Sequence, residues 1–288
     1  MRLGPLLSSS GFKVTSFLEG ARKAKEMGYE CVELGANDPS GTSAVADLGH
    51  YSIDEVRNIV DEIRNMGMEI SALQCHVGYL FSDDAQLRHR IEHTKRMLEV
   101  ASRTGVQFVH TVTGHRPNNM TVEQAWQILT RTYNELLDYA NDVDVRLGIE
   151  PVFVYHVGNL STTRELMHRL GRTELFINFD PSHFPFHRES PVPFIHEFAS
   201  KIIHAHAKDA MVTQLKIGDP LPAHAFYMGN EEASAFAAPG RGQLNWNELL
   251  QALREVGFDG VLSLELGHGI PDEESAARDT VTFFRGLL

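Results

Sequence analysis

Short apolar runs alternate with longer segments of helical period along the whole chain, and this alternation restricts the fold more than any other feature. Helical patterns fit at about 14–27, 53–66, 84–104, 121–143, 160–171, 191–199, 244–256 and 272–287. Eight runs have the length and composition of buried strands, namely 2–7, 29–35, 68–75, 106–113, 145–150, 175–180, 201–206 and 260–265. Strict strand–helix alternation is typical of parallel α/β folds.

Eight strands and eight helices in this order close most simply as a barrel. The chain has 288 residues, close to the roughly 250 residues that a single (β/α)8 barrel uses. An open doubly wound sheet is the alternative that counting alone leaves. We therefore expect an α/β fold, a (β/α)8 TIM barrel forming a single domain over residues 1–288.

Several expected helices are preceded by side chains that satisfy the free amides of a first turn. The pairs three residues apart are Ser52 with Glu55, Thr121 with Gln124, Thr162 with Glu165, and Asn245 with Glu248. Each pair precedes an amphipathic run, which supports the assignment of that run as a helix against a sheet. His89, His93 and His168 fall within expected helices away from the strand ends, and we expect them to face solvent.

Composition excludes several classes of protein. No unbroken apolar run reaches the length of about 18 residues that a membrane span needs, and the N-terminal residues predict no export signal. The formal net charge of −12 opposes a nucleic-acid partner, because such binding depends on cationic groups that displace counterions. Cys31 and Cys75 lie in strand-like segments and are predicted to pack as thiols, which favours a cytoplasmic location.

The last four expected strands end in side chains that bind metals: Glu150, Asp180, His206 and Glu265. Carboxyl ends of barrel strands converge at one mouth, where bare carboxylates repel one another unless a cation compensates them. Three carboxylates and one imidazole form an oxygen-rich set. The sequence therefore predicts one divalent ion, with Mn²⁺ first and Mg²⁺, Co²⁺ or Zn²⁺ as alternatives.

The residues two positions before each expected ligand provide an internal check. Side chains alternate along a strand, so these residues should also point into the barrel. They are small or polar and suit a layer that supports a metal site: Gly148, Asn178, His204 and Ser263.

Five segments resemble a known family, the sugar phosphate isomerase/epimerase-like proteins of the xylose isomerase-like barrel superfamily. The motifs are IEP at 149–151, FDPSHF at 179–184, IIHAHAKD at 202–209, PGRGQLNW at 239–246 and GFDGVLSLE at 257–265. The resemblance implies one divalent metal on the four expected ligands. It also implies a role for His183 at the substrate oxygens or beside the metal.

The resemblance further implies an isomerase or epimerase of a sugar or keto-sugar. Its proton abstraction next to a carbonyl would pass through a metal-stabilised enediolate, with Glu150 and Glu265 exchanging the proton from opposite faces. Ketose 3-epimerases of the superfamily carry a further glutamate and an arginine where this chain has His156 and Val212. The residues that bind the substrate must therefore differ from those of ketose 3-epimerases. An inosose dehydratase-like or keto-sugar lyase activity is the alternative.

Two further classes are less favoured. An apurinic-site endonuclease of the same superfamily would carry an Asp-x-His pair after the seventh strand, which is missing here. A non-catalytic barrel subunit would not need four intact ligands. The expected partner is a small sugar or cyclitol, with no nucleic acid and no membrane, and a homo-oligomer is compatible with the sequence.

Other polar residues near the expected strand ends are candidate substrate ligands: His76, His115, His156, Lys208 and Arg241. Lys208 would face the negative charge that develops during proton abstraction, although a surface lysine is an equal alternative. Asp209 is expected to orient Lys208 or to cap a turn. The segment 209–243 is too long for a plain connection and predicts a lid or a subunit contact, and the segment 36–52 predicts a similar role.

Overall fold

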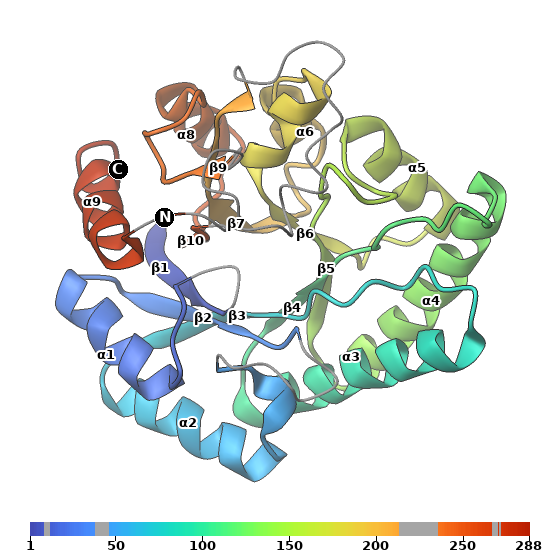
Figure 1. The fold of residues 1–288 in the computed structure, drawn as a ribbon, viewed down its shortest axis with the longest axis horizontal. Coiled ribbons are helices and arrows are strands. Elements are labelled where there is room, and N and C mark those ends of the chain that lie inside the picture. The colour runs from blue at the N-terminus through green and yellow to red at the C-terminus, as the bar shows by residue number, and fades with distance from the viewer. Residues whose placement is uncertain (9–11, 38–45, 213–235, 267–269, 271) are drawn as a thin grey trace.

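The computed structural model is a closed barrel of eight parallel strands with helices around it (Figure 1). It describes residues 1–8, 12–37, 46–212, 236–266, 270 and 272–288. The strands follow one another around the barrel in the order β1-β2-β3-β4-β5-β6-β7-β10, after which β10 pairs with β1. The predicted (β/α)8 TIM barrel is confirmed.

Each end of the barrel strands lies within two residues of the predicted run. They are β1 (Arg2–Leu7), β2 (Cys31–Gly35), β3 (Glu69–Gln74), β4 (Phe108–Thr111), β5 (Arg146–Ile149), β6 (Phe176–Phe179), β7 (Ile202–Ala207) and β10 (Val261–Leu264). The outer helices are α1 (Phe17–Met27), α2 (Ile53–Asn65), α3 (Asp84–Thr104), α4 (Val122–Asp142), α5 (Leu160–Leu170), α6 (Val192–Glu197), α8 (Trp246–Glu255) and α9 (Glu273–Arg285).

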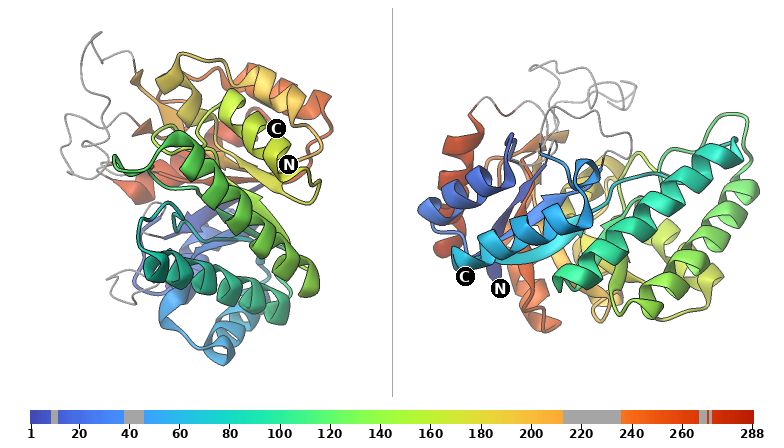
Figure 2. Two further views of the ribbon diagram at one scale, coloured as in Figure 1. Left: turned by 90° about the vertical axis from the view of Figure 1, so that its right-hand side faces the viewer. Right: turned by 90° about the horizontal axis from the view of Figure 1, so that it is seen from below.

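Shorter elements lie outside this alternation. They are the 3₁₀ helices η1 (Leu48–His50) and η2 (Pro181–His187) and an antiparallel pair of two-residue strands, β8 (Asp209–Ala210) and β9 (Phe236–Ala237). Most of the predicted lid segment 209–243, and part of 36–52, lie outside the described residues. The two chain termini lie close together at one end of the barrel (Figure 2).

Three of the four predicted helix caps are confirmed. Ser52 and Thr121 each form a capping box with the residue three positions on, and the Asn245 side chain accepts from the amide of Glu248. The prediction for Thr162 is wrong: α5 begins earlier, with Asn159 as its cap and Thr162 as the third residue of the helix. The side-chain oxygen of Asn159 accepts a hydrogen bond from the Thr162 amide at 3.0 Å, which makes Asn159 the cap.

Side-chain polarity separates the two faces of the strands, both of which are buried. Leu147 and Ile149 on β5 are buried among apolar residues, while His204 on β7 and Ser263 on β10 are buried polar residues. Both cysteines are free and buried, as the packing prediction requires. His89 and His168 are exposed as expected. The expectation for His93 is wrong, because its ring is buried and lies 2.8 Å from the Ala36 carbonyl oxygen.

The helices of the described residues include none that is both long and apolar enough to cross a membrane.

Gly148 leaves the space that the ring of Phe108 fills inside the barrel. An added Cβ would lie 2.5 Å from two ring atoms of Phe108. We expect Gly148→Ala to lower the free energy of unfolding by about 1–3 kcal/mol through overpacking, measured by urea denaturation. Gly286→Ala is the control, since its Cβ would have its nearest contact at an ordinary 3.5 Å. Equal stability of the two variants would contradict this account of the barrel interior.

Candidate metal centre and active site

The four predicted ligands meet at one end of the barrel. Glu150, Asp180 and Glu265 directly follow β5, β6 and β10, and His206 lies near the end of β7. All four side chains are buried, and each offers one ligand atom within 4.8 Å of the others. His206 Nδ1 lies 3.1 Å from Glu150 Oε2 and 2.9 Å from Glu265 Oε2. The strand-end argument therefore brings together the residues that it named.

The motif DPSH aims Asp180 and His183 at this cluster. Asp180 caps η2, and its Oδ1 accepts the Ser182 amide at 2.8 Å, so its Oδ2 is left facing the cluster. Pro181 starts η2 with the fixed backbone angle that suits a first helical position. One turn on, His183 Nε2 lies 3.3 Å from both Glu150 Oε1 and Asp180 Oδ2.

Lys208 is a member of the same cluster and not a surface lysine. Its side chain is 3% exposed, and its Nζ lies 2.8 Å from Asp180 Oδ2 and 2.7 Å from Glu265 Oε2. The ammonium also lies over the ring of Phe236, 4.7 Å from the centroid. A buried lysine is stable only when it is paired, and here two of the predicted ligand carboxylates pair with it.

Charges within the cluster shift its titrating groups strongly. Burial alone would raise the pKa of Glu150, but the neighbouring His206 and His76 hold that pKa well below its usual range. Burial is likewise outweighed at Glu265, whose pKa is lowered chiefly by Lys208 and His206. The carboxylates in turn raise the pKa of Lys208 and of His206 against the effect of burial. The mouth is thus a set of ionised carboxylates that attracts positive charge.

The donor set fits a divalent cation. Three carboxylates face one another beside His206 Nδ1, a buried nitrogen that no described residue meets with hydrogen-bond geometry. An imidazole nitrogen among carboxylate oxygens is typical of a metal ligand, with the ion in the place of the proton that these oxygens otherwise favour. The divalent cation would be held by Glu150, Asp180, His206 and Glu265.

A polar layer lies beneath the cluster, as the alternation along the strands predicts. Asn178 Nδ2 donates to Glu150 Oε2 at 2.6 Å. The Asn178 carbonyl lies 2.7 Å from His204 Nδ1, which must therefore donate. Burial lowers the pKa of His204 to about 3, so the ring is neutral. Two residues of this layer, Glu33 on β2 and His110 on β4, were not among the predicted site residues, although each interrupts an apolar strand.

An aromatic cluster forms one wall beside the site. Phe153 stacks on Phe186 with centroids 3.8 Å apart and lies 5.7 Å from the His183 ring. Phe236 meets His183 edge-on at 5.9 Å. The charged groups therefore have an apolar neighbour on the side of η2 and β9.

Asp209 organises the PGRG segment instead of orienting Lys208. Its buried carboxylate accepts from the backbone amides of Gly240 and Leu244 at 3.1 and 3.0 Å. It also accepts from Trp246 Nε1 at 3.0 Å. Asp209 therefore fixes the chain between β9 and α8, close to the cluster through its neighbour Lys208.

The predicted substrate ligands divide into two groups. His76 reaches the cluster, with its Nε2 3.4 Å from Glu150 Oε2, as does Lys208. The structure does not bring the other three to the cluster. His115 is exposed against Tyr155, and His156 packs on Trp126 with centroids 4.4 Å apart. Arg241 is exposed and pairs with Asp279 of α9 at 3.3 Å.

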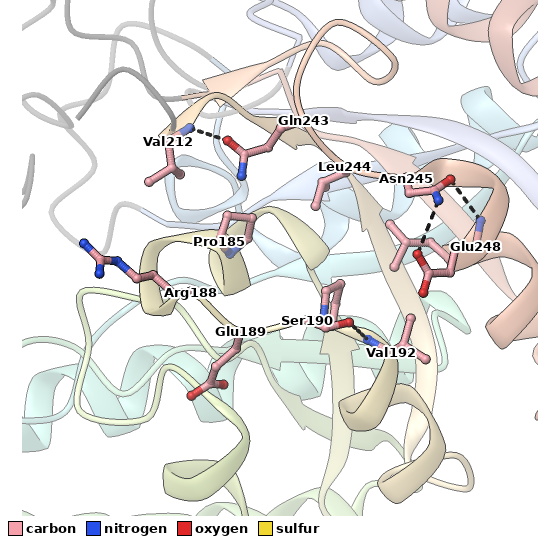
Figure 3. Close-up of a pocket in the computed structure, with 12 residues that line it drawn as sticks. Pro185, Arg188, Glu189, Ser190, Val192, Val212, Gln243, Leu244, Asn245 and Glu248 are labelled. Atoms are coloured by element: carbon pink, nitrogen blue, oxygen red, sulfur yellow. Dashed lines mark hydrogen bonds between the residues drawn. The ribbon is translucent and has the colours of Figure 1, made fainter. Parts of the chain in front are cut away.

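A separate surface pocket of about 520 Å³ lies between η2, α6 and the start of α8 (Figure 3). Pro185, Arg188 and Gln243 are among its lining residues. None of the four predicted metal ligands lines it. The buried charges converge at the barrel mouth instead, which is therefore the candidate site.

Comparison with known proteins agrees with this geometry. A sequence profile described as xylose isomerase-like TIM barrel matches residues 21–287. The chain belongs to this family.

Curated relatives that match the chain share 22–27% identity with it. The chain is similar to the inosose dehydratase of Clostridium botulinum, with 27% identity over 150 residues, which are 50% of this chain and 47% of that protein. It therefore spans about half the length of the inosose dehydratases that it matches. The match to the inosose isomerase of Bacillus velezensis is longer, with 23% identity over 252 residues, covering 83% of this chain and 79% of that protein.

Solved structures show the same fold over the full chain. The 3-keto-D-glucoside 4-epimerase of E. coli superposes with a TM-score of 0.76 at 15% identity, covering 99% of each chain. The IOLI protein, solved with a zinc atom, has a TM-score of 0.78 at 20% identity, covering 100% of this chain and 98% of that one. At these identities the likeness shows the barrel of the family.

Removal of the buried ammonium tests the charge balance of the site. In chelator, Lys208→Met leaves Asp180 and Glu265 without their cation and should lower the free energy of unfolding by about 3–5 kcal/mol. Added Mn²⁺ should restore much of this loss, because it supplies positive charge to the same oxygens. Lys95→Met, which breaks a 2.7 Å pair with Glu135 on the outer helices, should cost less than about 1 kcal/mol. Equal losses for the two variants in urea denaturation would refute the assignment.

Proposed function

We propose that this protein is a divalent-metal-dependent isomerase or epimerase of a keto-sugar or cyclitol ketone, acting by proton transfer at a carbon next to a carbonyl. One observation carries the proposal, namely that four side chains from separate strand ends place their ligand atoms within 4.8 Å of one another. A divalent cation bound there would polarise a substrate carbonyl and acidify the adjacent C–H bond. Mn²⁺ is the first candidate because three of the four donors are carboxylates.

In this proposal the chain's own residues move the proton. Glu150 and Glu265 enter the site from β5 and β10, and their lowered pKa values keep them ionised as bases. One carboxylate takes the proton from carbon, and the other, after taking up a proton from solvent, delivers that proton to the opposite face of the same carbon. Lys208 stabilises the negative charge that develops on the substrate oxygens. His183 and His76, whose rings contact Glu150, orient that carboxylate and bind substrate hydroxyls.

Dehydration of an inosose is the second candidate, because the curated relatives include the inosose dehydratase of Clostridium botulinum. It uses the same first step. A carboxylate removes the proton next to the carbonyl, the C–O bond to a β-hydroxyl breaks, and that oxygen leaves as water after it receives a proton from an acid in the site. In this candidate His183, which lies on η2 beside Glu150, would be the acid that supplies that proton. The roles proposed for His115, His156 and Arg241 find no support in their positions.

Deuterium exchange tests the proton transfer. In D₂O with Mn²⁺, the protein should incorporate deuterium next to the carbonyl of a keto-sugar or inosose, followed by mass spectrometry or NMR. Glu265→Gln should reduce the exchange rate by about 10²–10⁴-fold, the usual contribution of a general base, while circular dichroism stays unchanged. Glu62→Gln is the control, because Glu62 is an exposed residue of α2. This variant should exchange the substrate proton at the wild-type rate. Retention of full exchange by Glu265→Gln would show that the base is misassigned.

The products separate the two candidates. A product of the same composition with an inverted configuration at one carbon identifies an epimerase. A product of the same composition with its carbonyl at another carbon identifies an isomerase. Loss of one water with a new absorbance from a conjugated ketone identifies a dehydratase.

Metal dependence is a separate prediction. Dialysis against a chelator should abolish exchange, and Mn²⁺, Co²⁺, Mg²⁺ and Zn²⁺ returned one at a time should restore it, with Mn²⁺ giving the highest rate. Elemental analysis should find one ion per chain in wild type. Asp180→Asn should weaken binding, because the amide gives up the charge of one ligand. Full exchange in the chelated protein would exclude the proposed mechanism.

A further inference from the structure

The buried carboxylate of Glu33 lies on the far side of the His206 ring from the predicted metal position. Glu33 is fully buried on β2, inside the barrel. Its Oε2 lies 3.2 Å from His206 Nε2. The other ring nitrogen of His206, Nδ1, faces Glu150 and Glu265 at 3.1 and 2.9 Å. The His206 ring thus lies between two acidic groups: Glu33 inside the barrel, and Glu150 with Glu265 at its mouth.

The partners of Glu33 fix which atoms carry protons. Ser263 Oγ lies 2.5 Å from Glu33 Oε2, and His110 Nε2 lies 2.5 Å from Glu33 Oε1. An ionised carboxylate only accepts hydrogen bonds, so all three neighbours must donate to Glu33. His206 therefore carries its proton on Nε2. When a metal ion takes the place of the proton that the surrounding carboxylates favour on Nδ1, that nitrogen offers its lone pair to the ion.

The same logic extends toward the mouth. A neutral His110 that donates through Nε2 must accept through Nδ1, which lies 3.1 Å from His76 Nε2. His76 then donates from Nε2, the atom that also lies 3.4 Å from Glu150. One buried carboxylate thereby orders the protons of two rings that it touches and of a third that it does not touch.

We propose that Glu33 is a positioning residue for the metal centre, which holds His206 as the Nε2–H tautomer so that Nδ1 is free to bind the ion. The proposal rests on the proposed function only in that it requires a metal at the cluster. A carboxylate behind a metal-bound histidine orients the ring and raises its basicity, and loss of such a partner typically weakens metal binding about 10–100-fold.

A second metal on Glu33, His110, His204 and His206 is the competing interpretation, since these four also offer closely spaced ligand atoms. The hydrogen bonds argue against it. Both nitrogens of His204 already have partners, Asn178 at 2.7 Å and Ser71 at 3.2 Å. Glu33 has three donors. An ion there would have to break this network, whereas an ion at the upper cluster meets the unpartnered His206 Nδ1.

The test measures metal affinity apart from catalysis. Co²⁺ is titrated against a chromophoric chelator into wild type, Glu33→Gln and Thr111→Val, and its visible absorption bands are recorded. Thr111→Val is the matched control, because it removes a buried hydrogen bond from β4 to the Gly148 carbonyl on the neighbouring strand β5 without touching His206. Glu33→Gln should weaken Co²⁺ binding about 10–100-fold and shift the absorption bands. Thr111→Val should lower thermal stability and leave both affinity and spectrum unchanged.

The outcomes separate the two proposals. Wild type without Co²⁺ binding would overturn the proposed function itself. Wild type and Glu33→Gln with equal affinity and identical spectra would overturn only the role of Glu33, as would two Co²⁺ ions per wild-type chain.

A measurement on wild type covers the case in which Glu33→Gln does not fold. Long-range ¹H–¹⁵N NMR of histidine-labelled protein with Zn²⁺ should show His206 protonated at Nε2 and metal-bound at Nδ1. A spectrum with the metal on Nε2, or with Nε2 unprotonated, would refute the assignment.

Discussion

Repulsion among buried carboxylates is the constraint on which the rest of this barrel depends. Glu150, Asp180 and Glu265 arrive at one rim because the carboxyl ends of parallel strands must converge there. Ions buried in this way are stable only with close counter-charges and satisfied hydrogen bonds. Lys208 and His206 supply those counter-charges from a single strand and its extension. The motif HAK therefore compensates the acids that the other three strands present.

The barrel interior reflects the same demand one layer down. An ordinary barrel core is filled by branched apolar residues, but here Glu33, His110 and His204 occupy interior positions and are fully or almost fully buried. Such a network is stable only when every member has its partner, and it then holds each ring in one orientation. Burying these polar groups costs free energy, but the resulting network fixes the orientation of the His206 ring, so that Nδ1 faces the cluster at the mouth.

Sequence alone predicted the parts of this structure that follow from local periodicity. Strand–helix alternation predicted the barrel, and the residues at the strand ends predicted the four clustered candidate ligands. Residues whose environment is set by distant segments were harder to assign. Glu33 is one charge in an apolar strand, and its burial depends on partners from β4, β7 and β10. The buried His93 ring has a hydrogen-bond partner 57 positions away in the chain, the Ala36 carbonyl. The helical periodicity of the sequence around His93 cannot predict such a distant partner.

The two ends of the substrate site follow different rules. The candidate metal ligands lie at strand ends, where the strand–helix periodicity alone locates them in the sequence. The positions at which ketose 3-epimerases were expected to grip substrate lie in loops. Here the His156 ring packs against Trp126, away from the ligand cluster, and Val212 packs against the aromatic cluster of Phe153 and Phe186. Because that wall is apolar and adjoins His183, we expect it to contact the carbon skeleton of the proposed substrate, whose oxygens would face Lys208.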